Sequence, residues 1–378
     1  MRVCVSAFLV TTTPGMKLAG VGRHMLSTLN QLTITDLGHH YDVFLKDDVD
    51  MPPEWLACPW ITWHRIPVKN SRQRIWWEHF RVGVEAKKLN ADVLLSLFVP
   101  LPLGCRVPMV SIAHDAFPRT NPDWYPPRKR LILDQMTSYA CRKSKAVVTV
   151  SEYSRNELCR AYGISKDKVF VAPNGPGNNV RMLSEEEMED VDLSKYGASN
   201  YIFSVSTIEP RKNMDGLIRG FSLLKEKYDL GDLRLLIAGA KGWLDSSIAQ
   251  VYEESSAKED IEFLGYVSDL ELNALMQKAQ LFAFPSYVEG FGIPALEAMT
   301  VGTPVMTSNT SSLPEVCGEY ASYCDPSSPE SICEALHAIL SDGAKAKSLV
   351  EGGLERAKQF SWDESVKKLE VGLNFAVN

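Results

Sequence analysis

Short apolar segments alternate with helical stretches along most of the chain, and this alternation constrains the fold more than any other feature. In the first half, the strand-like segments are residues 3–8, 41–45, 61–66, 93–97, 109–114, 146–150 and 169–172. They resume at residues 201–205, 233–238, 261–264, 281–284 and 304–307. Such alternation predicts parallel α/β sheets, because a helix usually carries the chain back before the next parallel strand.

A polar, strongly acidic segment at residues 184–190 interrupts the alternation. We interpret it as a surface excursion near a domain linker. A chain of 378 residues is long enough for about two domains. The sequence therefore predicts two α/β domains joined near this segment.

Charge and cysteine usage exclude several classes of protein. The net charge of −7 argues against a generally basic surface that binds nucleic acid. The eight cysteines are scattered and form no C-x-x-C pair, which argues against a zinc site or a disulfide framework. Residues 1–8 read as a first strand rather than a signal peptide, and no stretch has the apolar length of a membrane span. We therefore expect a cytoplasmic protein.

Two glutamates flank a glycine-rich turn in the segment Y-V-E-G-F-G-I-P-A-L-E, residues 287–297. Glu289 lies at the mouth of the G-F-G turn, and Glu297 lies about one helical turn past Pro294. A strand-like run precedes the turn, and a proline suits the first turn of a helix. The free backbone N–H groups of such a strand–turn–helix unit can receive an anion.

A second charged segment, S-T-I-E-P-R-K-N at residues 206–213, also follows a strand-like run. It places two cations, Arg211 and Lys212, at a strand-to-helix junction. Together the two segments supply positive charge for phosphates and carboxylates that can accept hydrogen bonds from hydroxyls. This combination suits a nucleotide sugar.

The E-P-R-K-N and E-G-F-G-I-P-A-L-E segments resemble those of retaining glycosyltransferases of family four, and the resemblance covers nearly the whole chain. It implies the α/β fold called GT-B, in which two Rossmann-like domains face each other across a cleft. The first domain is expected at residues 1–180, together with a helix at 361–378 that crosses back to it. The second, which binds the nucleotide sugar, is expected at residues 195–360.

The resemblance implies roles for the charged residues of the second domain. It places Lys212 on the donor phosphates, with Arg211 as the next candidate and Glu209 as a supporting ion-pair partner. Many relatives carry an arginine near the position of Ser206. Cleavage of a sugar–phosphate bond leaves a diphosphate that gains negative charge, and fixed cations can offset that charge. Without the resemblance, the two cations could equally be a solvated pair at a helix start.

The two glutamates receive different roles from the resemblance. Glu289 is expected to contact the hydroxyls of the transferred sugar, and Glu297 those of the nucleotide ribose. A retaining reaction can use Glu289 as a nucleophile or can proceed by departure and attack on the same face of the sugar, and we favour the same-face route. The remaining donor-binding residues implied are Ser206, Gly265, Tyr266, Gly290, Phe291, Gly292, Ile293, Ser311 and Ser312.

Two segments of the first domain are also expected to face the donor. Gly20 and Gly22 open a helix after the first strand, where glycine lets the backbone approach a phosphate. Alone, G-x-G is weak evidence, and a plain tight turn would explain it. His114 ends a strand-like run, where α/β sheets place ligands, and resembles the family's histidine beside the donor sugar. Asp115 is expected to orient His114 or to approach the acceptor hydroxyl.

Basic and aromatic residues gather in two further segments of the first domain. Trp76, Trp77 and Arg119 are the acceptor-side candidates among them. Such residues could bind an acidic saccharide or lie against anionic lipid headgroups. Ordinary helix packing with a charged outer face explains the two tryptophans equally well.

Two D-x-D patterns match the metal-binding signature of the other large glycosyltransferase fold. They lie at Asp48 and Asp50 and at Asp190 and Asp192, and neither adjoins the glycine-rich segments. A pattern of two residues is frequent by chance, so we interpret both as solvated turns. We predict no metal ion and no other cofactor.

The sequence thus predicts a retaining hexosyltransferase, with mannose from GDP-mannose as the first expectation for the donor. A UDP-glucose donor, a nucleotide-sugar epimerase of the same fold and a non-catalytic sugar-nucleotide-binding subunit remain alternatives. The expected partners are a nucleotide sugar and a saccharide or lipid-linked acceptor, with no nucleic acid. A lipid-linked acceptor would need peripheral contact with the inner face of the membrane.

Overall fold

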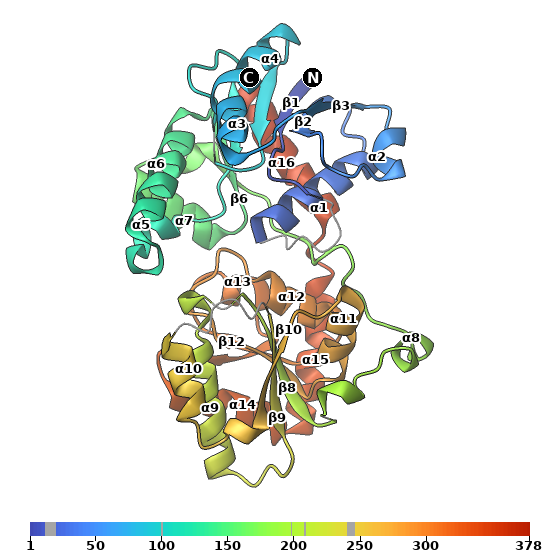
Figure 1. Ribbon diagram of the computed structural model, residues 1–378, viewed down its shortest axis with the longest axis vertical. Helices are drawn as coiled ribbons and strands as arrows, with labels where there is room; N and C mark the ends of the chain where they lie inside the picture. Colours follow the sequence, from blue (N-terminus) through green and yellow to red (C-terminus); the bar gives the residue numbers. More distant parts are fainter. Residues whose placement is uncertain (12–19, 100, 198, 208, 240–245) are drawn as a thin grey trace. The chain divides into compact units, whose positions relative to one another are not determined.

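The chain forms two compact units, which a computed structural model describes over residues 1–11, 20–99, 101–197, 199–207, 209–239 and 246–378 (Figure 1). Unit 1 comprises Met1–Asn174 and Ser361–Asn378, and unit 2 comprises Gly175–Phe360. Each unit contains one parallel sheet with helices packed against it. This is the two-domain α/β architecture that the alternating sequence pattern predicts.

The sheet of unit 1 has seven parallel strands in the order β3-β2-β1-β4-β5-β6-β7. Their bounds are β1 Arg2–Ser6, β2 His40–Lys46, β3 Ile61–Ile66, β4 Val93–Ser96, β5 Met109–Ile112, β6 Ala146–Thr149 and β7 Val169–Val171. Most of these short strands are buried along their length, as expected for parallel strands covered on both faces.

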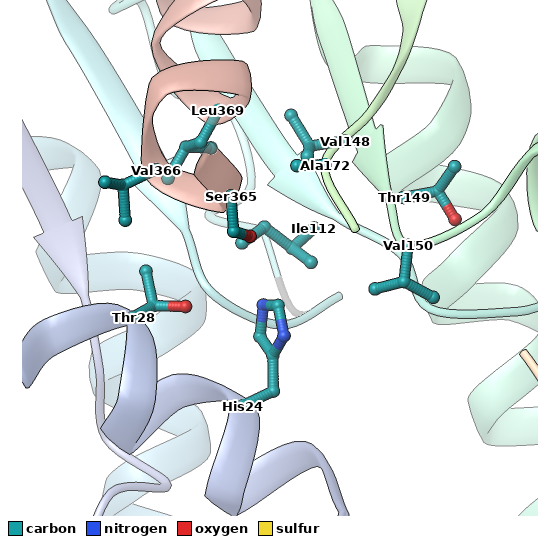
Figure 2. Close-up of a pocket in the computed structure, with 10 residues that line it drawn as sticks. All are labelled: His24, Thr28, Ile112, Val148, Thr149, Val150, Ala172, Ser365, Val366 and Leu369. Atoms are coloured by element: carbon teal, nitrogen blue, oxygen red, sulfur yellow. The ribbon is translucent and has the colours of Figure 1, made fainter. Parts of the chain in front are cut away.

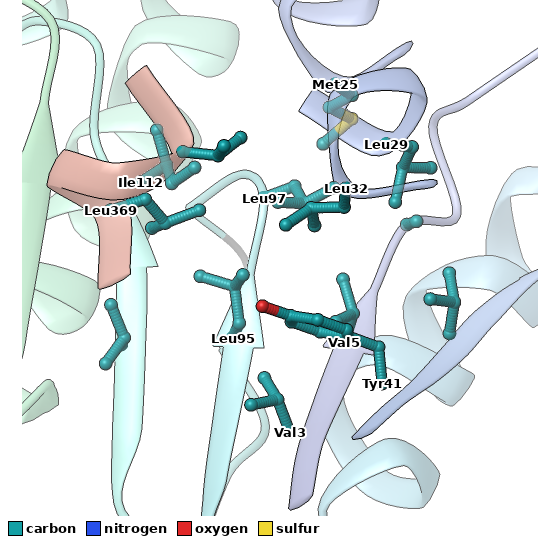
Figure 3. Packing of buried hydrophobic residues seen from close by; sticks show 14 of the residues in the cluster. Val3, Val5, Met25, Leu29, Leu32, Tyr41, Leu95, Leu97, Ile112 and Leu369 are labelled. Atoms are coloured by element: carbon teal, nitrogen blue, oxygen red, sulfur yellow. The ribbon is translucent and has the colours of Figure 1, made fainter. Parts of the chain in front are cut away.

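Helices cover both faces of the unit 1 sheet. They are α1 Gly20–Ile34, α2 Pro53–Ala57, α3 Ser71–Trp76, α4 Val82–Lys88, α5 Phe117–Thr120, α6 Pro127–Lys143, α7 Glu152–Tyr162 and α16 Trp362–Val377. Successive strand side chains point to opposite faces, so Val3 and Val5 join the core under α1 and α16, whereas Cys4 joins the core under α4, α6 and α7. Figure 3 shows part of the first core, to which Leu369, Ile112 and Leu95 all belong.

The last helix belongs to unit 1 although it follows unit 2 in the chain. Ser361 caps α16 by accepting a hydrogen bond from Glu364 N. One face of α16 then packs on the sheet through Val366, Leu369 and Leu373, each at most 3% exposed. The returning helix predicted from the sequence is therefore present, and it completes the core of unit 1.

The sheet of unit 2 has six parallel strands in the order β10-β9-β8-β11-β12-β13. Their bounds are β8 Tyr201–Val205, β9 Arg234–Ala238, β10 Ile261–Gly265, β11 Leu281–Phe284, β12 Val305–Ser308 and β13 Ala321–Cys324. The helices of unit 2 are α8 Glu185–Glu189, α9 Met214–Lys227, α10 Ser246–Glu253, α11 Asp269–Lys278, α12 Ile293–Thr300, α13 Leu313–Cys317, α14 Pro329–Leu340 and α15 Gly343–Ala357.

The final strand, β13, is not among the strands expected from the sequence. It is only four residues long and includes the polar Ser322 and Tyr323, so it has no continuous apolar run. It forms as a strand because it pairs in parallel with β12 along its whole length. Tertiary pairing has here overridden a weak local signal.

The chain enters unit 2 earlier than the expected start at residue 195. Gly177 N donates to Glu297 Oε1 over 3.2 Å, and Leu183 N donates to Gln277 Oε1 over 2.8 Å. These contacts attach residues 175–194 to unit 2 before β8 begins.

Among the described residues, no helix is both long enough and apolar enough to cross a membrane.

Candidate active site

The two charged segments of unit 2 follow neighbouring strands at the point where the sheet reverses direction. From β8 the chain proceeds outward to β9 and β10, and then returns to add β11 on the other side of β8. The segment that starts at Ser206 follows β8, and the segment that carries Glu289 follows β11. The carboxyl ends of strands at such a switch point are where open α/β sheets bind ligands.

Glu289 is held between the two cations of the first segment. Lys212 Nζ donates to Glu289 Oε1 over 2.6 Å, and Arg211 donates to Glu289 Oε2 over 2.7 Å. Glu209 accepts from Arg211 Nε over 3.0 Å on the solvent side of the cluster. Glu209, Arg211, Lys212 and Glu289 therefore form one ion-paired cluster. The sequence analysis assigned the cations to phosphate binding and Glu289 to sugar binding, and it did not predict that they pair with each other.

Burial and charge act in opposite directions on this cluster. Glu289 and Lys212 are each 6% exposed. Burial by itself raises the pKa of Glu289, but the adjacent charges of Arg211 and Lys212 outweigh it and hold the pKa at about 2. The carboxylate is therefore ionised at neutral pH, and it can accept hydrogen bonds but cannot donate a proton.

Asn213 fixes the geometry of this junction, although the sequence suggested no role for it. It adopts a left-handed conformation with φ of 56° at the start of α9. Its side-chain oxygen accepts from Gly216 N, and its amide nitrogen donates to Pro285 O over 2.9 Å and to Pro326 O over 2.7 Å. Asn213 thus ties the end of β11 to the segment that carries Lys212.

The loop after β12 supports Glu289 through its backbone. Ser311 Oγ accepts from Glu289 N over 3.0 Å, and Ser312 Oγ lies within hydrogen-bond distance of the carbonyl oxygens of Glu289 and Phe291. Ser312 is fully buried, so its hydroxyl stabilises the glycine-rich turn from inside. The donor contacts expected of both serines remain predictions.

The glycine-rich turn depends on Gly292. Gly292 has φ of 106°, and a Cβ atom there would lie 2.7 Å from Leu313 Cδ2. Phe291 is buried, with its ring 5.6 Å from that of Phe360. Its role here is to anchor the turn. Gly290 and Ile293 are partly exposed beside it, at the start of α12.

Glu297 lies inside α12 and is 2% exposed. Its Oε1 accepts from Gly177 N, and a Cβ atom on Gly177 would lie 2.7 Å from that oxygen. The structure thus shows Glu297 holding the segment through which the chain enters unit 2. Its contact with a ribose remains a prediction.

The neighbouring strand ends carry buried hydroxyls that have no partner among the described residues. Ser206 Oγ follows β8, and Ser286 Oγ follows β11. The resemblance implied Ser206 as a donor-binding residue, at a position where many relatives carry an arginine, whereas sequence reasoning missed Ser286. Buried polar atoms are normally paired, so two unpaired hydroxyls at a switch point indicate room for a ligand or ordered water.

The ends of β9 and β10 approach each other closely at this edge. Gly239 N donates to Gly265 O over 2.8 Å, and a Cβ atom on Gly239 would lie 2.0 Å from Ser206 O. Tyr266, next along the chain, is 68% exposed, so its ring is accessible to a ligand. The sequence also makes residues 239–243 candidates for the pocket that binds the base, and of these residues 240–243 lie outside the described part of the chain.

In unit 1, the expected histidine, His114, is partly buried beside a second, buried histidine, His24. The rings of His114 and His24 meet edge to face with centroids 4.6 Å apart, and His24 Nδ1 lies 2.8 Å from Asn174 Oδ1. Burial, together with the neighbouring imidazole, holds the pKa of His114 well below its usual value. Burial lowers the pKa of His24 to about 4 despite its bond to Asn174.

Both imidazoles are therefore neutral at neutral pH, and Nε2 of each has no partner among the described residues. A small pocket with about 10 Å³ of space, roughly enough for one water molecule, lies beside His24 (Figure 2). Polar groups from α1, β6 and α16 line it, namely His24, Thr28, Thr149 and Ser365. Sequence reasoning missed His24, although it lies two residues after Gly22.

The other expected residues of unit 1 have structural contacts. Asp115 Oδ1 accepts from Phe117 N over 3.0 Å at the start of α5. Arg119 forms two hydrogen bonds with the carboxylate of Asp134. Gly20 begins α1 with no atom of the described residues within 4 Å of an added Cβ, and Gly22 is buried inside that helix. The ligand contacts expected of these four residues remain predictions.

The D-x-D segments have local contacts that fit solvated turns. Asp48 pairs with Lys46 at 3.1 Å, and Asp192 accepts from Ser194 N over 2.9 Å. Over the described part of the chain, no three His, Cys, Asp or Glu side chains gather in a way that could hold a metal ion.

The two parallel-sheet units, with a cation–carboxylate cluster at the switch point of the second, define a glycosyltransferase of the GT-B fold. Residues 18–176 match the family model described as Glycosyltransferase Family 4, and residues 185–356 match that described as Glycosyl transferases group 1. The chain belongs to glycosyltransferase family 4.

Several known proteins are similar to this chain. O-antigen chain mannosyltransferase B of Escherichia coli is 33% identical over 256 residues, which are 67% of each chain. Serotype-specific mannosyltransferases WbdA of the same species also match, but the aligned region spans only about a third of their length.

Solved structures show the same fold over almost the entire chain. WaaG, a glycosyltransferase involved in lipopolysaccharide biosynthesis, has a TM-score of 0.72 at 17% identity and covers 98% of this chain and 99% of its own. Anabaena HepE in complex with UDP-glucose has a TM-score of 0.72 at 16% identity, with the same coverage.

Proposed function

We propose that this protein is a retaining hexosyltransferase that moves mannose from GDP-mannose to a saccharide or lipid-linked acceptor without a metal ion. The observation that carries the proposal is the cluster of Arg211, Lys212 and Glu289 at the switch point of unit 2. It supplies two cations for a diphosphate and one ionised carboxylate for sugar hydroxyls.

The name of the Escherichia coli relative supports mannose and an O-antigen-type saccharide acceptor. A UDP-glucose donor is the second candidate, supported by the HepE complex of the same fold. Backbone groups at the ends of β9 and β10 would contact the base. The identities of the side chains there therefore do not indicate whether the donor carries GDP or UDP.

In the same-face route, the bond between sugar C1 and the diphosphate oxygen breaks while the acceptor oxygen bonds to C1 from the same side. The acceptor proton passes to the departing diphosphate oxygen, so no protein base is needed. Arg211 and Lys212 offset the charge that the diphosphate gains. Glu289, ionised and held in place, orients the sugar through its hydroxyls.

A calorimetric panel of GDP, UDP, ADP, GDP-mannose and UDP-glucose, each with and without EDTA, tests the donor. We expect GDP and GDP-mannose alone to bind, with the same affinity in both buffers. Binding of UDP and UDP-glucose instead would change the donor assignment. Binding that disappears with EDTA would contradict the metal-free cation cluster.

Product analysis tests the reaction itself. We expect mannose transfer with retained anomeric configuration, read by NMR of the glycoside. Release of an altered free sugar nucleotide without any acceptor would instead show an epimerase. Donor binding with neither transfer nor slow hydrolysis would show a non-catalytic subunit.

A further inference from the structure

A continuous helical segment of unit 1 carries apolar side chains on its outward face. It runs from α3 through one π-helical turn, η1 Trp77–Arg81, into α4. Ile75, Trp76, Phe80 and Val84 are each 45–53% exposed on it. Leu103, 50% exposed, lies beside them because its N–H donates to His79 O over 2.8 Å. These five residues are called the Trp76 face below.

The Trp76 face is not needed for packing within unit 1. The inward side of the same helical segment already supplies core contacts, since Val82 and Ala86 are fully buried against the sheet. Trp77 also points inward and packs on Phe8 with ring centroids 6.3 Å apart. A surface helix normally has a polar outer face. Ordinary packing therefore explains Trp77 but leaves Trp76 and its neighbours unexplained.

The part of the chain that carries the Trp76 face is basic. Residues 65–88 contain seven lysines and arginines and two glutamates, a net charge of +5 in a chain whose total is −7. Both glutamates are paired with these cations: Glu78 is buried against Arg74, and Glu85 pairs with Arg81 and Lys88. The outward charge is therefore positive, and Arg81 lies 5.8 Å from the centre of the Trp76 ring.

An apolar centre with a basic margin matches an anionic bilayer better than it matches an acidic saccharide. Aliphatic and aromatic side chains can enter the boundary between headgroups and acyl chains, while lysine and arginine reach the phosphates. A saccharide would instead need polar partners at the centre, where Ile75, Phe80 and Val84 offer none. Five clustered apolar residues are also more than the singly scattered ones normal on a protein surface.

We propose that the Trp76 face is a membrane-docking surface that binds bilayers containing anionic phospholipid. The segment lies in the interface plane, with Trp76 and Phe80 inserted and the basic residues on the headgroups. The proposal rests on the proposed function and deepens it. An enzyme that uses a lipid-linked acceptor must reach that acceptor from the membrane surface.

The test is sedimentation of the full chain with vesicles of equal parts phosphatidylcholine and phosphatidylglycerol, and with phosphatidylcholine alone. We expect binding to the anionic vesicles that weakens as salt rises. Trp76→Ser combined with Phe80→Ser should lower this binding about tenfold or more. Ile34→Ser combined with Leu56→Ser removes exposed apolar residues elsewhere in unit 1 and should leave binding unchanged.

A second double variant, which reverses two charges, tests the electrostatic contribution to vesicle binding. Lys69→Glu combined with Arg72→Glu should lower binding to anionic vesicles about tenfold or more, because each basic residue near such a surface adds to the attraction. Lys347→Glu combined with Lys358→Glu makes the same charge change on α15 of unit 2 and at the residue that follows it, and should have no effect.

Three results would overturn the proposal. They are absence of binding to anionic vesicles, equal binding by the Trp76 and Phe80 double variant, and a dimer in solution that this double variant abolishes. Nucleotide calorimetry on the same variants keeps the two proposals distinguishable. Loss of vesicle binding with unchanged nucleotide affinity bears only on the membrane-docking surface. Absence of nucleotide binding by the unsubstituted chain bears only on the proposed function.

Discussion

Lys212 Nζ lies 2.6 Å from Glu289 Oε1, and both side chains are buried at the switch point of the unit 2 sheet. A lysine that would bind phosphate and a carboxylate that would bind sugar are thus already paired with each other. Removing one partner of a buried pair leaves the other uncompensated, which is strongly destabilising. Substitutions here will therefore change stability as well as activity, and both must be measured.

Replacing Lys212 with methionine keeps much of the side-chain volume and removes the charge. We expect Lys212→Met to weaken donor binding about tenfold or more, with a parallel loss of turnover, because the diphosphate loses a fixed cation. We also expect a loss of about 3–5 kcal/mol in the free energy of unfolding, because Glu289 stays buried and ionised.

Calorimetry with the donor and urea unfolding measure the two effects of Lys212→Met. Lys347→Met, on the exposed surface of α15, is the control for loss of one charge. Unchanged donor affinity in a folded Lys212→Met variant would rule out the phosphate role.

Replacing Glu289 with glutamine should separate sugar orientation from nucleotide binding. We expect turnover to fall about 100-fold, because the neutral amide accepts more weakly from the sugar hydroxyls. Affinity for the nucleoside diphosphate should not weaken, because Arg211 and Lys212 are released from an opposing charge.

Steady-state kinetics and nucleotide calorimetry check the Glu289→Gln variant. Glu209→Gln is the matched control, since Glu209 also pairs with Arg211 but is about half exposed. A Glu289→Gln variant that loses nucleotide affinity would instead make Glu289 a nucleotide contact.

Gly239 has no room for a side chain in its present backbone conformation. Its φ is 149°, and an added Cβ atom would lie 2.0 Å from the backbone oxygen of Ser206. We expect Gly239→Ala to cost at least about 2 kcal/mol more than Gly231→Ala. Gly231 also has positive φ but has open space around its Cβ position, so it isolates the steric contact.

Thermal unfolding compares the two glycine variants, and calorimetry asks whether donor binding changes with them. Because Gly239 joins the ends of β8 and β10, its variant should also weaken nucleotide binding. Equal melting temperatures for the two variants would show that the strand ends separate without cost.

His24 predicts how the stability of unit 1 depends on pH. Its pKa is about 4 in the folded chain and about 6.5 when unfolded, so below pH 6.5 the unfolded chain binds a proton that the folded chain does not. The contribution of His24 is fully present above about pH 6.5. It declines by roughly 3 kcal/mol as the pH falls to about 4.

Urea unfolding of the original chain and of His24→Gln at several pH values measures this contribution. The variant should lose less stability between pH 7 and pH 4.5. His114 contacts the His24 ring, and its pKa is also lowered. The contribution of His114 to the pH dependence of stability is therefore present in both proteins. Parallel curves would show that His24 does not titrate in the expected way.

The sequence by itself was enough to predict two parallel α/β domains, the returning helix from Trp362, and the positions of both charged segments. These features depend on local patterns: apolar runs of strand length, glycine turns and helix-start residues within a few positions of one another. β13 was missed because its polar residues break the apolar run, and its pairing with β12 is not local.

Contacts between residues far apart in the chain were decided only by the tertiary structure. Glu289 and Lys212 are 77 residues apart, and His24 and Asn174 are 150 apart. No periodicity links such pairs, because the order of strands in the sheet decides which loops meet. The same holds for the two adjacent tryptophans, because Trp77 packs partly buried against Phe8 whereas Trp76 is half exposed.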